Sequence, residues 1–356
     1  MLKRILWLFV VLAVAAATVA TVFYFRVNAP YRGYTAPGLY LEIPQGSGSM
    51  TIGERLVAAG VVRDMVTYRI ALYVSGRARH LQAGEYRFEH AMTPFQVIDK
   101  IARGDVIVIT VTFPEGLSIA EMSRIFESHH LGKAAAFVAA ARDPGLIREL
   151  DPAATDLEGY LFPDTYPLSL RVDAPQLIRL MVARFMHAFP ADLRQKAAER
   201  NLSVRQAVTL ASIVEKETGR ADERPLVAAV YVNRLRIGMP LQCDPTIIYA
   251  LQRAGKYTGD LKREDLALNS PYNTYRFPGL PPGPIASPGR ASLEAAVNPA
   301  TAEYIYFVSR NDGSHAFAKT LDEHNKNVYE FQVKYFRDRR AAKAAAAGAS
   351  EETGRQ

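Results

Sequence analysis

Two glutamates near the end of a helical stretch are the residues of this sequence best suited to proton transfer. Ser203 is predicted to begin this helix, with Gln206 three residues later completing a capping box. At about 100° per residue the apolar side chains form one broad arc, Glu215 and Glu217 lie on its two edges, and Lys216 points away. A carboxyl group beside an apolar surface is partly desolvated, which raises its pKa and suits general-acid catalysis. Ordinary solvated charges fit the same spacing, and helix phase does not choose between the two glutamates.

Polar and aromatic residues that could hold a substrate follow downstream. Asp244-Pro245 indicates the start of a helix with Asp244 as cap, and a polar role for Asp244 in a cleft is equally compatible. The stretch 270–284 is rich in Pro and Gly and carries aromatic rings and an amide, which together suit a ring-shaped polar substrate such as a sugar. A purely structural loop would explain the prolines equally well. The candidates on this loop are Tyr272, Asn273 and Tyr275.

Several other chemistries are excluded by the residue inventory. Cys243 is the only cysteine, so neither an intrachain disulfide nor a thiolate–zinc cluster can form. The seven histidines include no H-E-x-x-H pair, and no phosphate loop, dinucleotide-binding turn or G-x-S-x-G elbow is present. No motif therefore implies a metal ion or an organic cofactor.

The first element that must position this chemistry is a membrane anchor. Residues 5–25 form an unbroken uncharged run after Lys3-Arg4, and about 20 apolar residues cross a bilayer as a helix. A cleavable signal peptide is the alternative, because small residues occur at 15–17. The apolar run continues past them without a polar region, so we expect an uncleaved anchor. Basic residues flank both sides, but the early start favours a cytoplasmic stub at 1–4 and an exported body.

The body is predicted to begin with a linker, 26–38, and a small α/β module at 39–110. A strand, a Pro-Gln/Glu-Gly turn and a helix follow one another at 39–59 and again at 106–126. Internal duplication would produce this similarity, and so would coincidence, because the arrangement is common. Between the two copies we expect a strand at 86–88 and a helix from Thr93-Pro94.

The remainder, 111–340, is predicted to be a larger mixed α+β domain. It is mostly helical up to residue 198, apart from a turn-rich aromatic insert at 158–166. A strand at 305–308 and a final helix at 328–336 follow, and the Ala-rich tail 341–356 is predicted to be disordered. The expected fold class is α+β: an N-terminal transmembrane helix, a small module and a larger catalytic domain.

The charge distribution excludes a nucleic-acid binder. The chain of 356 residues has a formal charge of +7, of which +4 lies in 1–33 and +2 in 337–356. The body between them is nearly neutral and lacks the basic surface that phosphate backbones require.

These motifs together resemble one known family, that of the endolytic murein transglycosylases (MltG/YceG-like). The similarity covers the whole chain after the linker, in the same order. The matching segments are 158–166, 211–218, 233–235, 237–239, 241–246, 272–275, 279–285, 306–308, His315, Phe317 and His324-Asn325. Cys243 departs from the family pattern, where a small polar residue such as Thr is expected; this near-isosteric change casts little doubt on the match.

The resemblance implies an inner-membrane, single-pass enzyme with its body in the periplasm, which cuts nascent peptidoglycan strands internally. It also implies that the module at 39–110 is LysM-like, and that the enzyme works near peptidoglycan synthases. The family's catalytic glutamate corresponds to Glu217, and Glu215 remains the second candidate. Asp244, Tyr272, Asn273 and Tyr275 would position the sugar or stabilise positive charge on it, with Glu215 also among the substrate-binding residues.

Two other functions stay open at this stage. A non-catalytic glycan-binding scaffold would bind strands without cutting them. A hydrolytic muramidase, with Asp244 or Glu215 as its second carboxylate, would leave a reducing end instead of a 1,6-anhydro end.

Overall fold

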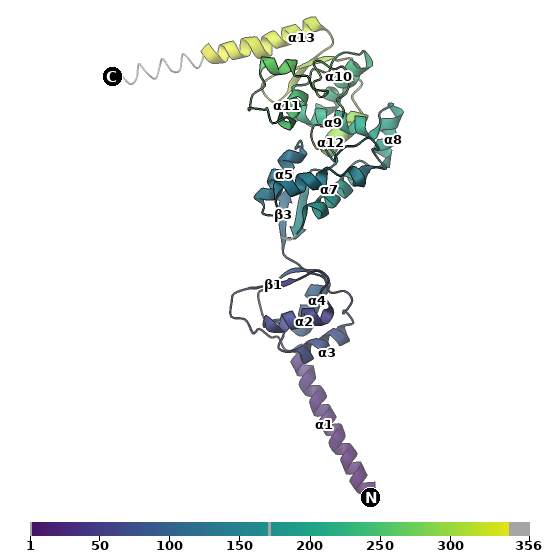
Figure 1. Cartoon of the computed structure of the whole chain (residues 1–356), viewed down its shortest axis with the longest axis vertical. Helices are drawn as coiled ribbons and strands as arrows, with labels where there is room; N and C mark the ends of the chain where they lie inside the picture. The colour runs from purple at the N-terminus through teal and green to yellow at the C-terminus, as the bar shows by residue number, and fades with distance from the viewer. Residues whose placement is uncertain (1, 170–171, 342–356) are drawn as a thin grey trace, which may run out of the picture. The chain divides into compact units, whose positions relative to one another are not determined.

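The computed structural model describes residues 2–169 and 172–341, and it divides into two compact units. The first comprises Met1–Val111 with Tyr166–Val172, and the second comprises Thr112–Thr165 with Asp173–Gln356. Figure 1 shows both units along the chain, coloured from purple to yellow. Most of the predicted disordered tail, from residue 342 on, lies outside the described residues.

The N-terminal apolar run forms one helix, α1 (Leu2–Asn28). Its segment Leu6–Asn28 is long and apolar enough to cross a membrane, and the side chains of this segment are almost all exposed. The helix extends three residues beyond the predicted anchor, and Val27 at its end is buried in the core of the first unit. Arg26 forms an ion pair with Asp64 at 2.9 Å. The end of α1 is therefore part of the first unit.

The residues predicted as a linker are bound to the module that follows. Tyr31 forms a β-bridge with Met92, and the Gly33 N–H donates to Gly60 O at 2.8 Å. A Cβ on Gly60 would approach the Gly33 carbonyl carbon to 2.9 Å, and Gly60 has a φ of +71°. This close approach requires glycine. The segment is thus less free than its proline and glycine content indicates.

The first unit is built on a two-stranded antiparallel sheet. Strand β1 (Leu39–Ile43) pairs with β2 (Gly84–Phe88), in a register that joins Leu39 to Phe88 and Ile43 to Gly84. Three helices complete the unit: α2 (Ser49–Ala58), α3 (Met65–Ser75) and α4 (Pro94–Ala102). The predicted strand at 86–88 and helix from Thr93-Pro94 are confirmed.

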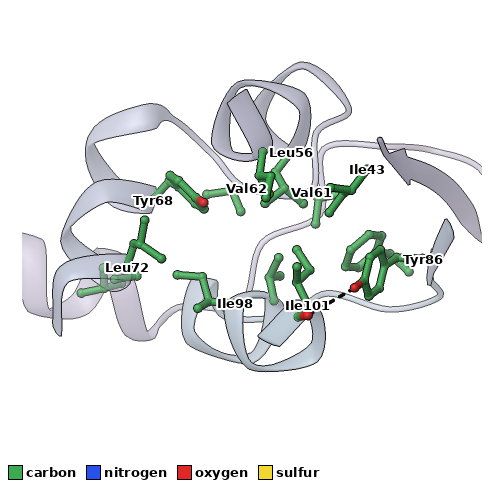
Figure 2. Packing of buried hydrophobic residues seen from close by; sticks show 14 residues of the cluster. Ile43, Leu56, Val61, Val62, Tyr68, Leu72, Tyr86, Ile98 and Ile101 are labelled. Atoms are coloured by element: carbon green, nitrogen blue, oxygen red, sulfur yellow. Dashed lines mark hydrogen bonds between the residues drawn. The ribbon is translucent and has the colours of Figure 1, made fainter. Parts of the chain in front are cut away.

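Buried side chains from the helices and both strands form the core of this unit (Figure 2). Tyr86 and Tyr68 are fully buried, and each hydroxyl is satisfied by backbone carbonyls: Tyr86 donates to Gln82 and Ile101, and Tyr68 to Ser49. Buried hydroxyls that keep a partner avoid the cost of desolvation. The module therefore has a complete core of its own.

The two strand–turn–helix stretches predicted from the sequence are both present. The second consists of β3 (Val108–Thr112) and α5 (Ile119–Ser128). Gly46 and Gly116 occupy equivalent places, with φ of +76° and +77°, each two residues before the helix cap. A left-handed φ at the same position favours glycine in both copies. The local similarity is thus structural, while duplication remains a hypothesis.

The second unit is mainly helical, with short strands. Its sheet consists of β5 (Tyr306–Ser309), which pairs antiparallel with β6 (His315–Ala318). Strand β4 (Thr165–Ser169) pairs with β3, and four of the five residues of each of these two strands belong to the first unit. The remaining helices are α6 (Ala134–Ala141), α7 (Ala174–Ala188), α8 (Ala191–Glu199), α9 (Val204–Glu217), α10 (Arg224–Arg236), α11 (Asp244–Arg253), α12 (Arg290–Val297) and α13 (Leu321–Val328). Short 3₁₀ segments occur at Pro144–Ile147 and Arg263–Ala267, and a π-helical turn at Tyr329–Lys334.

The predicted final helix begins seven residues too late. The structure begins α13 at Leu321, because Thr320 and Glu323 form a capping box there, and the helical path continues through the π turn. In its coarse form the fold class is confirmed: the chain is mixed α+β with an N-terminal apolar helix.

Helix α9 lies at the centre of the second unit. Residues from Ala207 to Val214 are all buried, and the helix packs against α8, α10, α11 and α12 (Figure 1). As predicted, Ser203 and Gln206 form a capping box at its start. Burial of the helix on several sides fixes its C-terminal end, where the two candidate glutamates stand.

The aromatic insert and the proline-rich loop meet on this helix. Gly159 has a φ of +84°, and a Cβ there would lie 2.5 Å from Pro284 Cβ, so only glycine permits this approach. The Ser212 hydroxyl of α9 accepts from the Ile285 N–H at 3.1 Å. Arg205 donates both to Pro282 O at 2.6 Å and to buried Asp151 at 2.9 Å. The loop is thereby held against α9.

Candidate active site

Glu217 is the last residue of α9, and its carboxyl group meets side chains from two other elements. The Tyr231 hydroxyl of α10 donates to Glu217 Oε1 at 2.8 Å. The Cys243 thiol, at the start of α11, is also hydrogen-bonded to this carboxyl group. Tyr231 and Cys243 are both about 1% exposed, whereas Glu217 is partly open to solvent. The carboxyl group is therefore held against two buried side chains, on a residue that is half-buried as a whole.

The surroundings of Glu217 raise its pKa above the ordinary value of a glutamate. Burial is the largest cause, because it penalises the charged form. The hydrogen bonds from Cys243 and Tyr231 act in the opposite direction, and so does the nearby His315, while the charge of Asp244 adds to the rise. A carboxyl group of raised pKa can hold a proton and deliver it to a bound substrate.

Glu215 has a different environment. Arg224 Nη2 lies 3.1 Å from Glu215 Oε1, and the Gly289 N–H donates to Oε2 at 2.9 Å. The Glu215 side chain is 5% exposed and that of Arg224 is 9% exposed, so this is a buried ion pair. Both carboxylate oxygens of Glu215 thus have protein partners. The tertiary contacts therefore distinguish Glu215 from Glu217, which helix phase alone could not do.

Asp244 stands beside this site as a polar residue, and it is not the helix cap. Cys243 occupies the cap position, Asp244 is the first helical residue, and no side chain caps α11. The predicted cap is therefore wrong by one residue, because the Asp244 carboxylate instead accepts from the Tyr275 hydroxyl at 2.7 Å. Asp244 is exposed and Tyr275 is partly buried. Burial and the bond to Asp244 raise the pKa of Tyr275, so it stays a neutral donor.

Asn273 is fully buried beneath the loop. Its amide nitrogen donates to Leu266 O at 3.0 Å and to Leu268 O at 2.8 Å, and its carbonyl accepts from the Tyr275 N–H at 3.0 Å. The predicted contact of Asn273 with a sugar does not fit this burial. In this structure the amide holds the loop that presents Tyr275, since every one of these bonds is to backbone.

Tyr272 packs against two residues of α11. Its ring lies 5.0 Å from the ring of Tyr249, and the guanidinium of Arg253 lies 5.8 Å from its centroid. Both partners belong to the C-terminal half of α11, whereas Asp244 begins that helix. Among the predicted substrate residues, Asp244 and Tyr275 therefore lie at the start of α11, and Tyr272 lies beside its C-terminal half.

Three side chains around Glu217 had no predicted role. Tyr231 and Cys243 contact it directly, and His315 lies within electrostatic reach. His315 Nδ1 is 2.6 Å from Glu223 Oε2, and its backbone N–H donates to Glu223 Oε1 at 2.9 Å. Neither Tyr231 nor His315 lies on a helix face with Glu217, so periodicity gave no signal. His315 was indicated only as one of the residues that carry the resemblance, and Tyr231 lies two residues before the matching segment 233–235.

Within the part of the chain that the structure describes, no group of three His, Cys, Asp or Glu side chains could hold a metal ion. What the site offers is one partly desolvated carboxyl group, a hydroxyl and a thiol that orient it, and an exposed carboxylate–phenol pair nearby. This arrangement is typical of an enzyme that works by acid–base catalysis.

Comparison with known proteins places the chain in a family. Residues 41–330 match the YceG-like family, and the chain belongs to it. The endolytic murein transglycosylase of Bacillus subtilis (strain 168) is 33% identical over 304 residues, which cover 80% of this chain and 82% of that protein. The endolytic murein transglycosylase of Streptococcus pneumoniae serotype 2 is 30% identical, over 85% of this chain and 59% of that longer protein.

A solved structure shares the fold. The crystal structure of a YceG-like protein from Listeria monocytogenes is 32% identical, covers 82% of this chain and 99% of that chain, and has a TM-score of 0.55. The match thus extends over both units of this chain.

Proposed function

We propose that this protein is an endolytic lytic transglycosylase of peptidoglycan. It would cleave the bond between N-acetylmuramic acid and N-acetylglucosamine inside nascent strands, leave 1,6-anhydro ends and so terminate strand elongation. Family membership and the relatives named endolytic murein transglycosylase support the reaction class. The observation that carries the assignment to Glu217 is the position of its carboxyl group between the buried Tyr231 hydroxyl and Cys243 thiol, where burial raises its pKa.

The reaction needs only one acid–base group. Protonated Glu217 gives its proton to the glycosidic oxygen as the bond from C1 of the muramic acid to that oxygen breaks. The C6 hydroxyl of the same sugar then attacks C1, and its proton passes to the Glu217 carboxylate. The acid is restored, and no water enters the product, so the second carboxylate of ordinary glycosidases is not required.

The neighbouring residues have different roles in this proposal. Tyr231 and Cys243 orient the Glu217 carboxyl group through their hydrogen bonds. Asp244 is accessible and would stabilise positive charge on the sugar ring, with Tyr275 fixing its carboxylate. For the buried residues we propose structural support: Asn273 holds the loop, and Glu215 anchors the end of α9 to Arg224. Tyr272 would contact the glycan strand beside the C-terminal half of α11.

The location of the enzyme is also a proposal. The apolar segment Leu6–Asn28 supports an uncleaved anchor in the inner membrane, with the remaining chain in the periplasm. The complete core of the first unit supports a separate, LysM-like module that would bind glycan. Peptidoglycan synthases are the expected partners, since new strands emerge from them.

The test is to digest uncrosslinked nascent glycan with the full-length protein in detergent and to read the product ends by mass spectrometry. We expect internal cuts that end in 1,6-anhydromuramic acid, and a loss on the order of 10³-fold in rate for Glu217→Gln. Glu294→Gln, which alters an exposed ion pair with Arg290, is the matched control and should cut normally.

Other products would contradict the proposal. Reducing ends, heavier by one water, would identify a hydrolase. Strands that remain intact but bound would identify a glycan-binding scaffold. Full activity of Glu217→Gln would move the catalytic role to another residue.

A further inference from the structure

A concave site separate from the candidate active site lies in the same unit, at the end of α11 opposite Asp244. It is a cavity of about 210 Å³ between α5, the end of α6 and the end of α11. Its floor contains Glu158, which is 7% exposed. The Ile119 N–H, at the first turn of α5, donates to Glu158 Oε1 at 3.0 Å, and the Tyr249 hydroxyl donates to Oε2 at 3.2 Å.

Three arginines line this cavity. Arg253 lies over the rings of Tyr249 and Tyr272, at 6.0 Å and 5.8 Å from their centroids. The side chains of Arg124 and Arg142 make no hydrogen bond or ion pair with any residue that the structure describes. Guanidinium groups placed at a cavity without protein partners are available to a ligand, and their planar fork matches a carboxylate.

The acidic groups of the cavity do not cancel this charge. Asp156 lies 3.8 Å from Arg253, and Glu121 is engaged by the Ser118 N–H and hydroxyl at the start of α5. Burial, more than any other cause, raises the pKa of Glu158 to about 8, so this residue is neutral at neutral pH. Three cations therefore face two anions, and the excess charge is positive. Ile119, Ala120 and Val138 also line the cavity and suit small apolar groups.

A depression of about 320 Å³ adjoins this cavity. Its lining shares three residues with the cavity: Glu121, Tyr249 and Gln252. Its lining also includes Lys216 and Pro245, the chain neighbours of Glu217 and Asp244. Pro245, Ile248, Tyr249 and Gln252 recur at helical spacing, so one face of α11 forms the floor of this depression.

We infer that this cavity binds the carboxylate of a stem peptide, on a glycan strand whose sugar lies at Glu217. Each muramic acid of a nascent strand carries a short peptide with small side chains and free carboxylates. The ten residues of α11 span about 15 Å, and an extended peptide covers about 3.3 Å per residue, so a peptide of five residues can reach from one end to the other. This inference rests on the proposed function and adds a specificity site to it.

The test compares peptide-bearing nascent strands with the same strands after an amidase has removed their peptides. The variant is full-length protein with Arg124→Gln and Arg142→Gln together; both side chains are exposed, so the fold should tolerate the change. For the peptide-bearing strands we expect KM to rise about tenfold with kcat unchanged. For the peptide-free strands KM should stay the same. Arg179→Gln, an exposed arginine on α7, is the matched control.

Two results would overturn the inference. One is a wild-type enzyme that does not distinguish the two substrates, and the other is a double variant that loses affinity for both equally. Free stem pentapeptide is titrated into the protein as a separate measurement, with binding expected for the wild type and lost in the double variant. If neither substrate yields 1,6-anhydro ends, the proposed function fails. The titration alone then decides whether the cavity binds the peptide.

Discussion

The Tyr231 hydroxyl lies 2.8 Å from Glu217 Oε1 and donates a hydrogen bond to it. Tyr231 comes from α10 and Glu217 from α9, so the packing of two helices creates this contact. Burial, the nearby Glu217 and the nearby Cys243 raise the pKa of Tyr231 well above its usual range, so it remains protonated and can only donate to a charged Glu217. Such a bond favours the carboxylate over the carboxylic acid.

Removal of this donor should change the pH dependence of cleavage. In Tyr231→Phe the Glu217 carboxylate loses a hydrogen bond, so the pKa of Glu217 rises further. A general acid works while it is protonated, and its activity falls as the pH rises through its pKa. The basic limb of kcat/KM should therefore move to higher pH, and the maximum should fall roughly tenfold because the carboxyl group is less well oriented. A pH–rate profile measures both effects.

Tyr73→Phe serves as the control, because Tyr73 is 89% exposed and its hydroxyl makes no hydrogen bond with the described residues. Its profile should match the wild type. If the basic limb of Tyr231→Phe stayed in place while the rate fell, the hydroxyl would act only through packing.

Glu215 should matter for stability more than for chemistry. Glu215→Gln breaks the buried ion pair with Arg224 and leaves this guanidinium with the half-exposed Glu115 alone, at 3.4 Å. We expect the free energy of unfolding to fall by about 3 kcal/mol, measured by denaturant titration. The folded fraction should still produce 1,6-anhydro ends. Glu294→Gln is the control, and its exposed pair should cost at most about 0.5 kcal/mol.

The opposite outcome for Glu215 is easy to recognise. A stable Glu215→Gln protein without cleavage, beside an active Glu217→Gln protein, would exchange the roles of the two residues.

Local patterns predicted much of the fold because local interactions produce it. The Ser203–Gln206 capping box, the helix from Thr93-Pro94 and the apolar N-terminal helix all follow from neighbouring residues. The contacts of the linker segment could not be predicted, since its pairing with Met92 and Gly60 depends on residues far along the chain. The strand pairings β1–β2 and β5–β6 likewise could not be read from single segments.

The candidate site was predicted only in part, for the same reason. Periodicity identified Glu215 and Glu217 but gave them equivalent positions, and only tertiary contacts with Arg224 and Tyr231 distinguish them. Cys243 received no role, yet its thiol contacts Glu217, so the one departure from the family pattern lies in direct contact with the candidate acid. Residue type on a loop does not reveal orientation, and Asn273 is an example.

Glu158 should make the stability of the second unit depend on pH. Its pKa rises from the ordinary 4.5 to about 8 in the folded chain, chiefly through burial. Between these two values the folded state holds a proton that the unfolded chain has released. The group's contribution to stability is therefore full below pH 4.5 and declines up to pH 8, by at most about 1.4 kcal/mol per pH unit.

Glu158→Gln stays neutral and can still accept from the Ile119 N–H, so its unfolding free energy should decline less between pH 5 and pH 8. Denaturant titrations followed by circular dichroism at both pH values measure this difference, with the exposed Glu149→Gln as the control. Equal slopes in wild type and Glu158→Gln would mean that Glu158 is ionised in the fold, and the cavity would then carry no excess of positive charge.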